Sequence, residues 1–155
     1  MWLTNYVKGA DIMSDCIFCM IRDGEIPSRK IYEDENVFAI LDNSQVTPGH
    51  TLLIPKKHVR NIYDYDEELA SEVFAAVPKV ARALRDFDPA VQGLNILINN
   101  EEVASQTVFH SHIHLLPRYT EEDDFGLEWA YNEDKYSDEE LDDMQNNIAN
   151  EVEEF

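Results

Sequence analysis

Three of the five histidines in this 155-residue chain occupy alternate positions, in the run His110-Ser111-His112-Ile113-His114. In a β-strand, residues two apart lie on the same face, roughly 6.6 to 6.8 Å from one another. We therefore expect three imidazoles on one side of a strand and Ile113 in the core. No packing argument requires such a histidine face. On their own, the histidines fit a transition-metal site or nucleophilic and acid–base chemistry equally well, and an incidental polar face less well.

More polar groups lie near this run or near another predicted strand. The loop before the run carries amide and hydroxyl groups that can hold phosphate oxygens: Asn99, Ser105, Gln106 and Thr107. Ordinary turn chemistry is the alternative explanation for these four residues. His50 and His58 flank a separate β-rich run, so we expect all five histidines in or beside strands.

Cys16 and Cys19 form a C-x-x-C pair. In a reducing cytoplasm, this spacing is more typical of a metal site or a redox pair than of a structural disulfide. One pair is a weak signal, because a tetrahedral zinc ion needs two further ligands. Apolar packing of the two thiols near Phe18 also remains open.

The elements that position these groups follow from hydrophobic spacing and turn residues. A capping box of Asp64 and Glu67 is expected to open the main helix, and Pro78 is expected to bend it. Three strands, a main helix and two more strands predict an α+β domain with an antiparallel five-stranded sheet and a short N-terminal helix. The predicted helices are residues 16–24 and 69–87, and the predicted strands are residues 30–32, 37–41, 50–55, 94–99 and 108–116.

Negative charge is concentrated towards the C-terminus. The formal net charge is −20, and residues 120–155 hold 15 of the 32 acidic residues but one of the 12 basic ones. Such a field repels the backbone of DNA or RNA, so we expect no extended nucleic acid as a partner. We expect a cytoplasmic protein without a membrane span, because no apolar run approaches the roughly 18 residues that a span needs. Within the tail, Ser137 and Glu140 predict a capped helix, which we interpret as a solvated acidic one.

Taken together, these motifs resemble the histidine triad (HIT) family, whose signature alternates histidines with apolar residues. Ser111 departs mildly from that signature, at the first apolar position. The resemblance implies a HIT domain over residues 14–119, an N-terminal extension over residues 1–13, an acidic tail over residues 120–155 packed on or flanking the domain, and a homodimer. It is carried by the triad with Leu115 and Leu116, and by residues 25–27, 33–34, 38–42, 48–50, 54–58 and 105–109.

The resemblance also implies catalytic roles. His112 would attack the α-phosphate of a purine mononucleotide conjugate, with His114 and the loop of Ser105, Gln106 and Thr107 on the phosphate oxygens, Gln106 near the scissile side, and His50 and His110 completing the cluster. Ile17, Phe18, Ile21 and Leu41 would surround the base, Asp42 would accept hydrogen bonds from the ribose, and Asn43 and Asn99 would flank the sugar and phosphate. The alternative for the four apolar residues is plain core packing.

The third triad position is histidine, which in this family favours hydrolysis over nucleotidyl transfer. The activity implied is therefore hydrolysis of AMP-type phosphoramidates through a nucleotidyl-histidine. Cleavage of dinucleoside polyphosphates, or a non-catalytic zinc-stabilised nucleotide-binding module, are the alternatives. The resemblance further implies a structural zinc ion held by Cys16, Cys19, His58 and His110.

Overall fold

The computed structural model describes residues 15–152, so the extension predicted for residues 1–13 lies outside the described residues. Contacts divide the chain into two units, one ending at Phe125 and the other starting at Gly126. No helix among residues 15–152 has the length and apolar character needed to cross a membrane. The first unit contains all five histidines and both cysteines.

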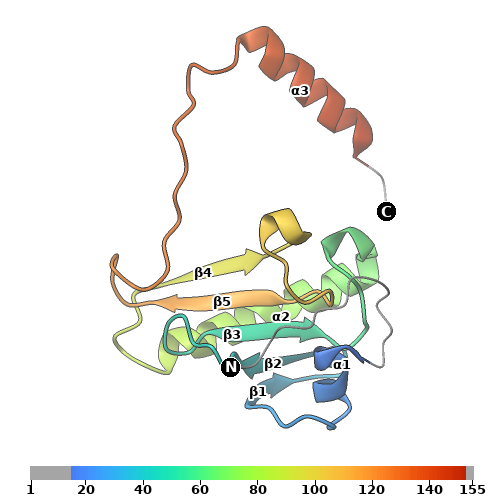
Figure 1. Cartoon of the computed structure of the whole chain (residues 1–155), viewed down its shortest axis with the longest axis vertical. Helices are drawn as coiled ribbons and strands as arrows, with labels where there is room; N and C mark the ends of the chain where they lie inside the picture. The colour runs from blue at the N-terminus through green and yellow to red at the C-terminus, as the bar shows by residue number, and fades with distance from the viewer. Residues whose placement is uncertain (1–14, 153–155) are drawn as a thin grey trace. The chain divides into compact units, whose positions relative to one another are not determined.

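A five-stranded antiparallel sheet forms the centre of the first unit (Figure 1). Its strands run in the order β1-β2-β3-β5-β4. This confirms the predicted antiparallel sheet with one main helix and a short N-terminal helix. The strands are β1 (Lys30–Glu33), β2 (Val37–Leu41), β3 (Thr51–Pro55), β4 (Gly93–Ile98) and β5 (Ile113–Arg118), and the helices of this unit are α1 (Ile17–Arg22), α2 (Glu67–Asp86) and the 3-10 turns η2 (Ile62–Asp64) and η3 (Glu102–Ala104).

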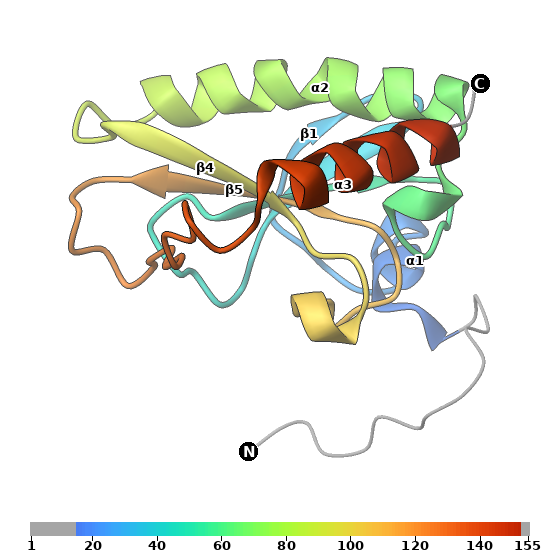
Figure 2. The same cartoon turned by 90° about the horizontal axis from the view of Figure 1, so that it is seen from above.

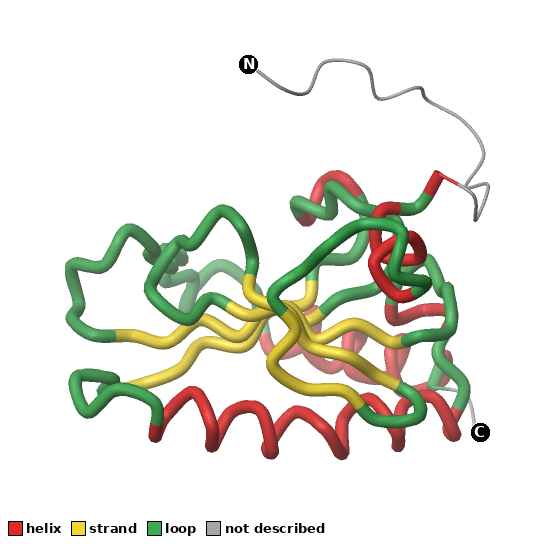
Figure 3. Tube along the Cα trace, turned by 90° about the horizontal axis from the view of Figure 1, so that it is seen from below, coloured by secondary structure: helices red, strands yellow, loops and turns green. Residues whose placement is uncertain are grey.

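The long helix α2 covers one face of the sheet, as Figures 2 and 3 show. Alternate residues of β2, β3 and β5 meet the buried stripe of this helix and form the larger core cluster. The members of this cluster include Val37, Ala39, Leu53, Ile113 and Leu115 from the sheet, and Leu69, Val73, Ala76, Val80 and Leu84 from α2. The opposite face of β5 therefore carries His114.

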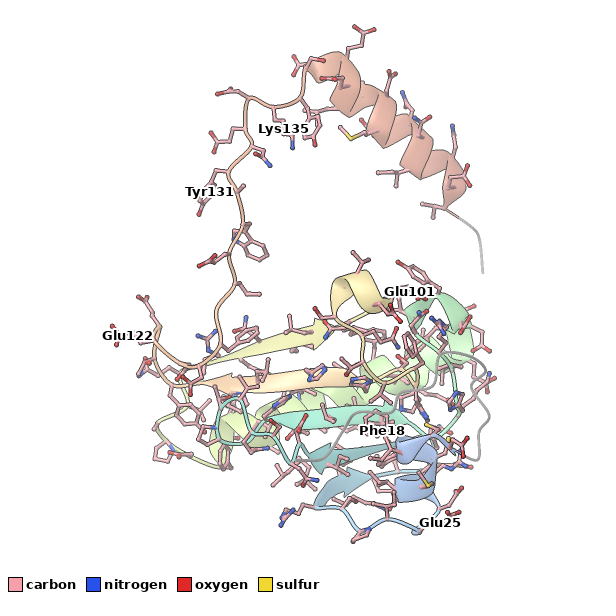
Figure 4. All side chains as sticks on the ribbon, in the orientation of Figure 1. Phe18, Glu25, Glu101, Glu122, Tyr131 and Lys135 are labelled. Carbon is pink, nitrogen blue, oxygen red and sulfur yellow. The ribbon has the colours of Figure 1, made fainter. Side chains whose placement is uncertain are left out.

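A smaller cluster occupies that opposite face. Phe18 and Ile21 of α1 pack on Phe38 and Ile40 of β2 and on Leu52 and Ile54 of β3. The short helix α1 lies beside the strands, with Phe18 labelled on it in Figure 4. Because β3 pairs with β5 at Leu52 and His114, the cluster lies next to the last triad histidine.

The start of α2 differs from the prediction. Asp64 lies in η2, and Asp66 is the residue that caps α2, with its carboxylate accepting a hydrogen bond from the Leu69 backbone N–H. The capping box of Asp64 and Glu67 is therefore wrong. Asn61 caps the preceding 3-10 turn, and the cap of α2 lies two residues later than predicted. Pro78 lies inside α2 as predicted.

The strand predicted over residues 108–116 is also wrong at its start. β5 begins at Ile113, so His114 lies in the strand, whereas His110 and His112 lie in the segment before it. The β3–β5 ladder stops at Leu53 and the β4–β5 ladder stops at Ile98, both opposite Ile113. The segment before β5 is held instead by a side-chain bond to the Pro55 carbonyl and by a backbone bond to Val59.

Within residues 126–152, the described part of the second unit, there is one helix, α3 (Asp138–Glu151), which opens with the predicted capping box of Ser137 and Glu140. No residue of this helix is buried, so Leu141 and Ile148 are exposed. Figure 4 labels Tyr131 and Lys135 on the stretch that precedes the helix. The helix has the exposed, acidic character that its sequence predicts.

Candidate functional site

The segment from His110 to His112 is tied to the domain on both sides. The His110 Nε2–H donates to the Pro55 carbonyl at 2.8 Å, and the Ser111 backbone N–H donates to the Val59 carbonyl at 2.8 Å. The Ser111 hydroxyl also lies 2.9 Å from the buried Tyr65 hydroxyl. The segment is therefore fixed before the strand begins, and the imidazoles it carries are fixed with it.

His112 has one ring nitrogen oriented by the backbone. Its Nδ1 lies 2.8 Å from the carbonyl oxygen of His110. A carbonyl can only accept, so Nδ1 holds the proton and Nε2 keeps its lone pair. Burial lowers the pKa of His112, and the side chain is 6% exposed. The result is a neutral imidazole with a defined tautomer, the form that a nucleophile needs.

His114 is linked to His50 and, through it, to Asp42. The His50 Nε2 lies 2.9 Å from the His114 Nδ1, and the Asp42 carboxylate lies 3.8 Å from the same Nε2. The Val46 backbone N–H points at the His50 Nδ1 at 3.4 Å. This arrangement places the His50 proton on Nε2, facing His114, and therefore places the His114 proton on its own Nε2.

The surroundings of His114 and His50 favour the neutral form of both imidazole rings. Burial lowers the pKa of His114 to about 4, with further lowering by the neighbouring His112 and His50. Burial also lowers the pKa of His50, although the Asp42 carboxylate acts in the opposite direction. At neutral pH the His114 ring can donate one hydrogen bond without carrying charge.

The turn before β3 places His50. Gly49 has a φ of +90°, a conformation that side-chain-bearing residues rarely adopt. A Cβ at this position would meet the Phe87 ring at 3.0 Å. Glycine therefore lets the chain enter β3 with His50 directed at His114 across the sheet.

The two cysteines meet two histidines in a separate cluster. The Cys16 Sγ lies 3.3 Å from the His110 Nδ1, and the Cys19 Sγ lies 3.3 Å from the His58 Nδ1 and 3.6 Å from the His110 Nδ1. All four ligand atoms lie within 4.8 Å of one another. The four residues predicted from the family resemblance to bind zinc therefore lie together.

The donor set fits a tetrahedral zinc ion. With Zn–S bonds of about 2.3 Å and Zn–N bonds of about 2.0 to 2.1 Å, sulfur and nitrogen ligands lie roughly 3.5 Å apart, close to the distances found here. The bond from the His110 Nε2–H to Pro55 leaves the Nδ1 lone pair towards the sulfurs. Burial raises the pKa of Cys19 to about 11, and a bound dication would reverse this shift by stabilising the thiolate.

The predicted phosphate loop has a strained backbone. Glu101 and Ser105 have positive φ values of 71° and 68°, which cost of order 1–3 kcal/mol each in such residues. The side chain of Gln106 is buried and holds the loop: its amide accepts from the Glu101 N–H at 2.8 Å and donates to the Arg60 carbonyl at 2.7 Å. Ser105 and Thr107 are exposed, on either side of this buried amide.

The residues predicted to surround base and sugar lie in different environments. Phe18 and Ile21 belong to the smaller core cluster, and Phe18 also packs edge-on against His112, with ring centroids 5.1 Å apart. Ile17 is exposed and Leu41 is half-buried. Their roles around a base, and those of Asn43 and Asn99, stay predictions. Asn43 accepts from Arg29 at 3.2 Å, and Asn99 donates to the Ser105 carbonyl at 3.3 Å.

Several residues that hold the site were absent from the sequence-based prediction. These include Tyr65, the Pro55 carbonyl and the carbonyl of His110. A backbone carbonyl has no signature in a sequence, and Tyr65 precedes a helix where an aromatic residue is unremarkable. The substitution of serine for an apolar residue at position 111 was the one available signal, because a buried hydroxyl needs a partner.

Comparison with known proteins gives a consistent result. A family model described as the HIT domain matches residues 23–121. The chain is 54% identical to Protein hit of Bacillus subtilis over 136 residues, which make up 87% of this chain and 92% of that protein. It is 34% identical to adenosine 5'-monophosphoramidase HNT1 of Candida albicans over 119 residues, covering 75% of this chain and 78% of the other.

Solved structures give the same result. A member of the HIT family from Bacillus subtilis matches with a TM-score of 0.87 and 51% identity, over 91% of this chain and 99% of that one. A zinc-bound histidine triad family protein from Mycobacterium smegmatis matches with a TM-score of 0.68 and 34% identity, over 90% and 99%.

Proposed function

The chain belongs to the HIT domain family, and from this membership and the geometry of its site we propose that it hydrolyses AMP-type nucleotide conjugates at the α-phosphate through His112. The membership confirms the predicted resemblance and the HIT-like fold. The observation that carries the proposal is the bond from the His112 Nδ1–H to the His110 carbonyl, which leaves Nε2 as the attacking atom. The named activity of the Candida relative supports a phosphoramidate as substrate.

In the first step, the lone pair of the His112 Nε2 forms a bond to the α-phosphorus. The phosphorus–nitrogen bond to the leaving amine breaks, and the amine departs with the electron pair and takes up a proton from water. The His112 ring becomes cationic, and the His110 carbonyl stabilises this charge through the Nδ1–H. A nucleotidyl-histidine results.

In the second step, water attacks the same phosphorus. The bond to His112 breaks, AMP is released, and the water loses one proton, which balances the proton taken up earlier. His114 supports both steps, because its Nε2–H can donate to a phosphate oxygen while His50 holds its other nitrogen. Asp42 is proposed to accept from the ribose hydroxyls.

The intermediate provides a direct test. The protein is mixed with an AMP phosphoramidate, quenched within a turnover and measured by mass spectrometry, and we expect one adenylyl group on the peptide that contains His112. Diadenosine polyphosphate serves as the competing substrate, and faster turnover of it would replace the phosphoramidate as the proposed substrate class. Nucleotide binding without an adduct and without turnover would contradict catalysis.

Zinc in the Cys/His cluster is part of the proposal. The zinc-bound mycobacterial relative and the fit of the four ligands support it. The ion would supply structural cohesion, tying α1 to the segment that carries His112. Elemental analysis of purified protein is expected to give about one zinc per chain.

We also propose a homodimer in the cytoplasm. β4 ends the sheet, and its Ile96 is 46% exposed, so an edge strand with an apolar residue is available for pairing. The free thiols of Cys16 and Cys19 suit a reducing compartment. Light scattering at micromolar concentration tests the dimer, and a monomer would contradict it.

A further inference from the structure

A second group of metal-ligating atoms lies outside the cysteine cluster. One ligand atom each from Asp42, His50 and His114 lies within 4.8 Å of the other two. The two nitrogens are 2.9 Å apart, and the Asp42 oxygen is 3.8 Å from the His50 nitrogen. Ligands of a tetrahedral ion with bonds of about 2.0 to 2.1 Å lie roughly 3.3 Å apart, and these distances fall on either side of that value. Small side-chain rotations would bring the three ligand atoms to the separations that a tetrahedral ion requires.

The backbone already fixes these three side chains. Asp42 directly follows β2, and its backbone N–H donates to the His50 carbonyl at 3.0 Å. His114 pairs with Leu52 of β3, two residues after His50. The other oxygen of the Asp42 carboxylate accepts from the Ser44 N–H at 2.7 Å, which turns the free oxygen towards His50. With Asp42 just after β2, His50 just before β3 and His114 within β5, the site needs little ordering to bind an ion.

The donor set indicates which ions would fit. Two imidazoles and one carboxylate suit divalent ions such as zinc, cobalt, nickel or iron, whereas magnesium and calcium prefer oxygen ligands. Binding requires the His50 proton to move from Nε2 to Nδ1, where the 3.4 Å contact with the Val46 N–H is given up. The His114 proton already lies on Nε2, so its Nδ1 is available, and no proton leaves the protein.

We propose that Asp42, His50 and His114 bind a second divalent transition-metal ion, and that this ion excludes nucleotide from the catalytic site. The exclusion rests on the proposed function, in which Asp42 and His114 hold the ribose and a phosphate oxygen. An ion bound to the free Asp42 oxygen takes the acceptor that the ribose hydroxyls would use, whereas the His114 Nε2–H stays available. The exclusion therefore follows from the lost ribose contact. The bound ion would thus be a competitive inhibitor of hydrolysis.

Cobalt(II) tests the site without measuring activity. Full-length protein loaded with one equivalent of zinc is titrated with Co²⁺ and followed by visible absorption. We expect one further equivalent with d–d bands but no sulfur-to-cobalt charge-transfer band, because the ligands are nitrogen and oxygen. A charge-transfer band would show cobalt on the cysteines and would overturn the assignment.

Variants locate the ion. Asp42→Asn and His50→Asn are expected to weaken Co²⁺ binding by tenfold or more. The control is Asp86→Asn, whose carboxylate pairs with Arg85 on the exposed side of α2, and it is expected to leave Co²⁺ binding unchanged. Thermal melts confirm that each variant folds. Unchanged Co²⁺ binding in the two folded site variants would overturn the proposal.

AMP separates this proposal from the proposed function. Addition of AMP is expected to displace Co²⁺ and abolish the d–d bands, and a ternary complex would overturn the exclusion. If AMP fails to bind even metal-free protein while the Co²⁺ site behaves as expected, the metal site stands. In that case the proposed nucleotide hydrolysis and its competitive inhibition by the ion are both contradicted.

Discussion

Two clusters of side chains lie on either side of one short segment, and they use the same residue type for opposite purposes. The cluster around His110 joins two sulfurs and two imidazoles, and the His110 Nε2–H is bonded to a strand carbonyl. The cluster around His112 joins imidazoles with a carboxylate, and the ring of His112 is turned so that its Nε2 keeps the lone pair. The partner of each second ring nitrogen, rather than histidine itself, separates the proposed structural ligand His110 from the proposed nucleophile His112.

Removal of the proposed nucleophile, His112, should distinguish the functions of the two clusters most strongly. We expect His112→Gly to lower kcat by at least about 10⁴-fold, the scale on which loss of a covalent nucleophile acts. AMP affinity should stay within a few-fold, because phosphate and ribose contacts remain. Steady-state turnover and isothermal titration measure the two quantities.

A chemical control strengthens this test. The cavity left in His112→Gly can admit free imidazole, and added imidazole is expected to restore part of the turnover. Full activity of the variant without imidazole would rule out covalent catalysis by His112. Zinc content should be the same as in the unaltered protein.

Disruption of the cluster of Cys16, Cys19, His58 and His110 should change zinc content and thermal stability. Cys19→Ser is expected to reduce zinc from about one per chain to near zero and to lower Tm by roughly 10 °C, since loss of a metal ligand costs several kcal/mol. Atomic absorption and calorimetry provide the measurements. Met20→Leu, on the same helix but outside the cluster, serves as the control. A metal-free protein with an unchanged Tm and normal turnover would contradict the structural zinc.

The His114 donor should have an intermediate effect. His114→Asn removes the ring that faces the proposed phosphate position, and we expect kcat to fall by about 10²- to 10³-fold, the typical effect of losing one stabilising donor. Zinc content and Tm are expected to stay near those of the unaltered protein, because His114 lies outside the Cys/His cluster. A variant with full kcat would remove His114 from transition-state stabilisation.

The sequence predicted the sheet and its helices better than it predicted the local geometry of the candidate site. β2 and β3 are short apolar runs that are buried on both faces, and such runs are visible in the sequence without coordinates. The start of β5 was not predictable in the same way, because it depends on where the partner strand ends. The partner strand β4 ends at Ile98, opposite Ile113, and the Ser111 N–H donates to the Val59 carbonyl, more than fifty residues earlier in the chain.

The orientation of the histidine rings was also not predictable from the sequence. The alternating spacing correctly placed His114 opposite the α2 core, but the two earlier histidines are directed by carbonyls of Pro55 and His110. Such bonds involve atoms that every residue has. Sequence motifs therefore indicate candidate ligands, whereas the tautomers of the rings follow only from the folded backbone.

The smallest expected effect joins the two clusters. Ser111 stands between His110 and His112, and Tyr65→Phe leaves the buried Ser111 hydroxyl without its 2.9 Å partner. An unsatisfied buried hydroxyl costs about 1–3 kcal/mol, so Tm should fall by a few degrees, with turnover reduced by no more than about threefold. Tyr63→Phe, at a position 77% exposed, is the matched control. Because loss of both partners can be nearly neutral, adding Ser111→Ala to Tyr65→Phe should recover part of the Tm. If Tyr63→Phe destabilises the protein as much, or if the double variant is the less stable, the bond does not hold the segment between the clusters.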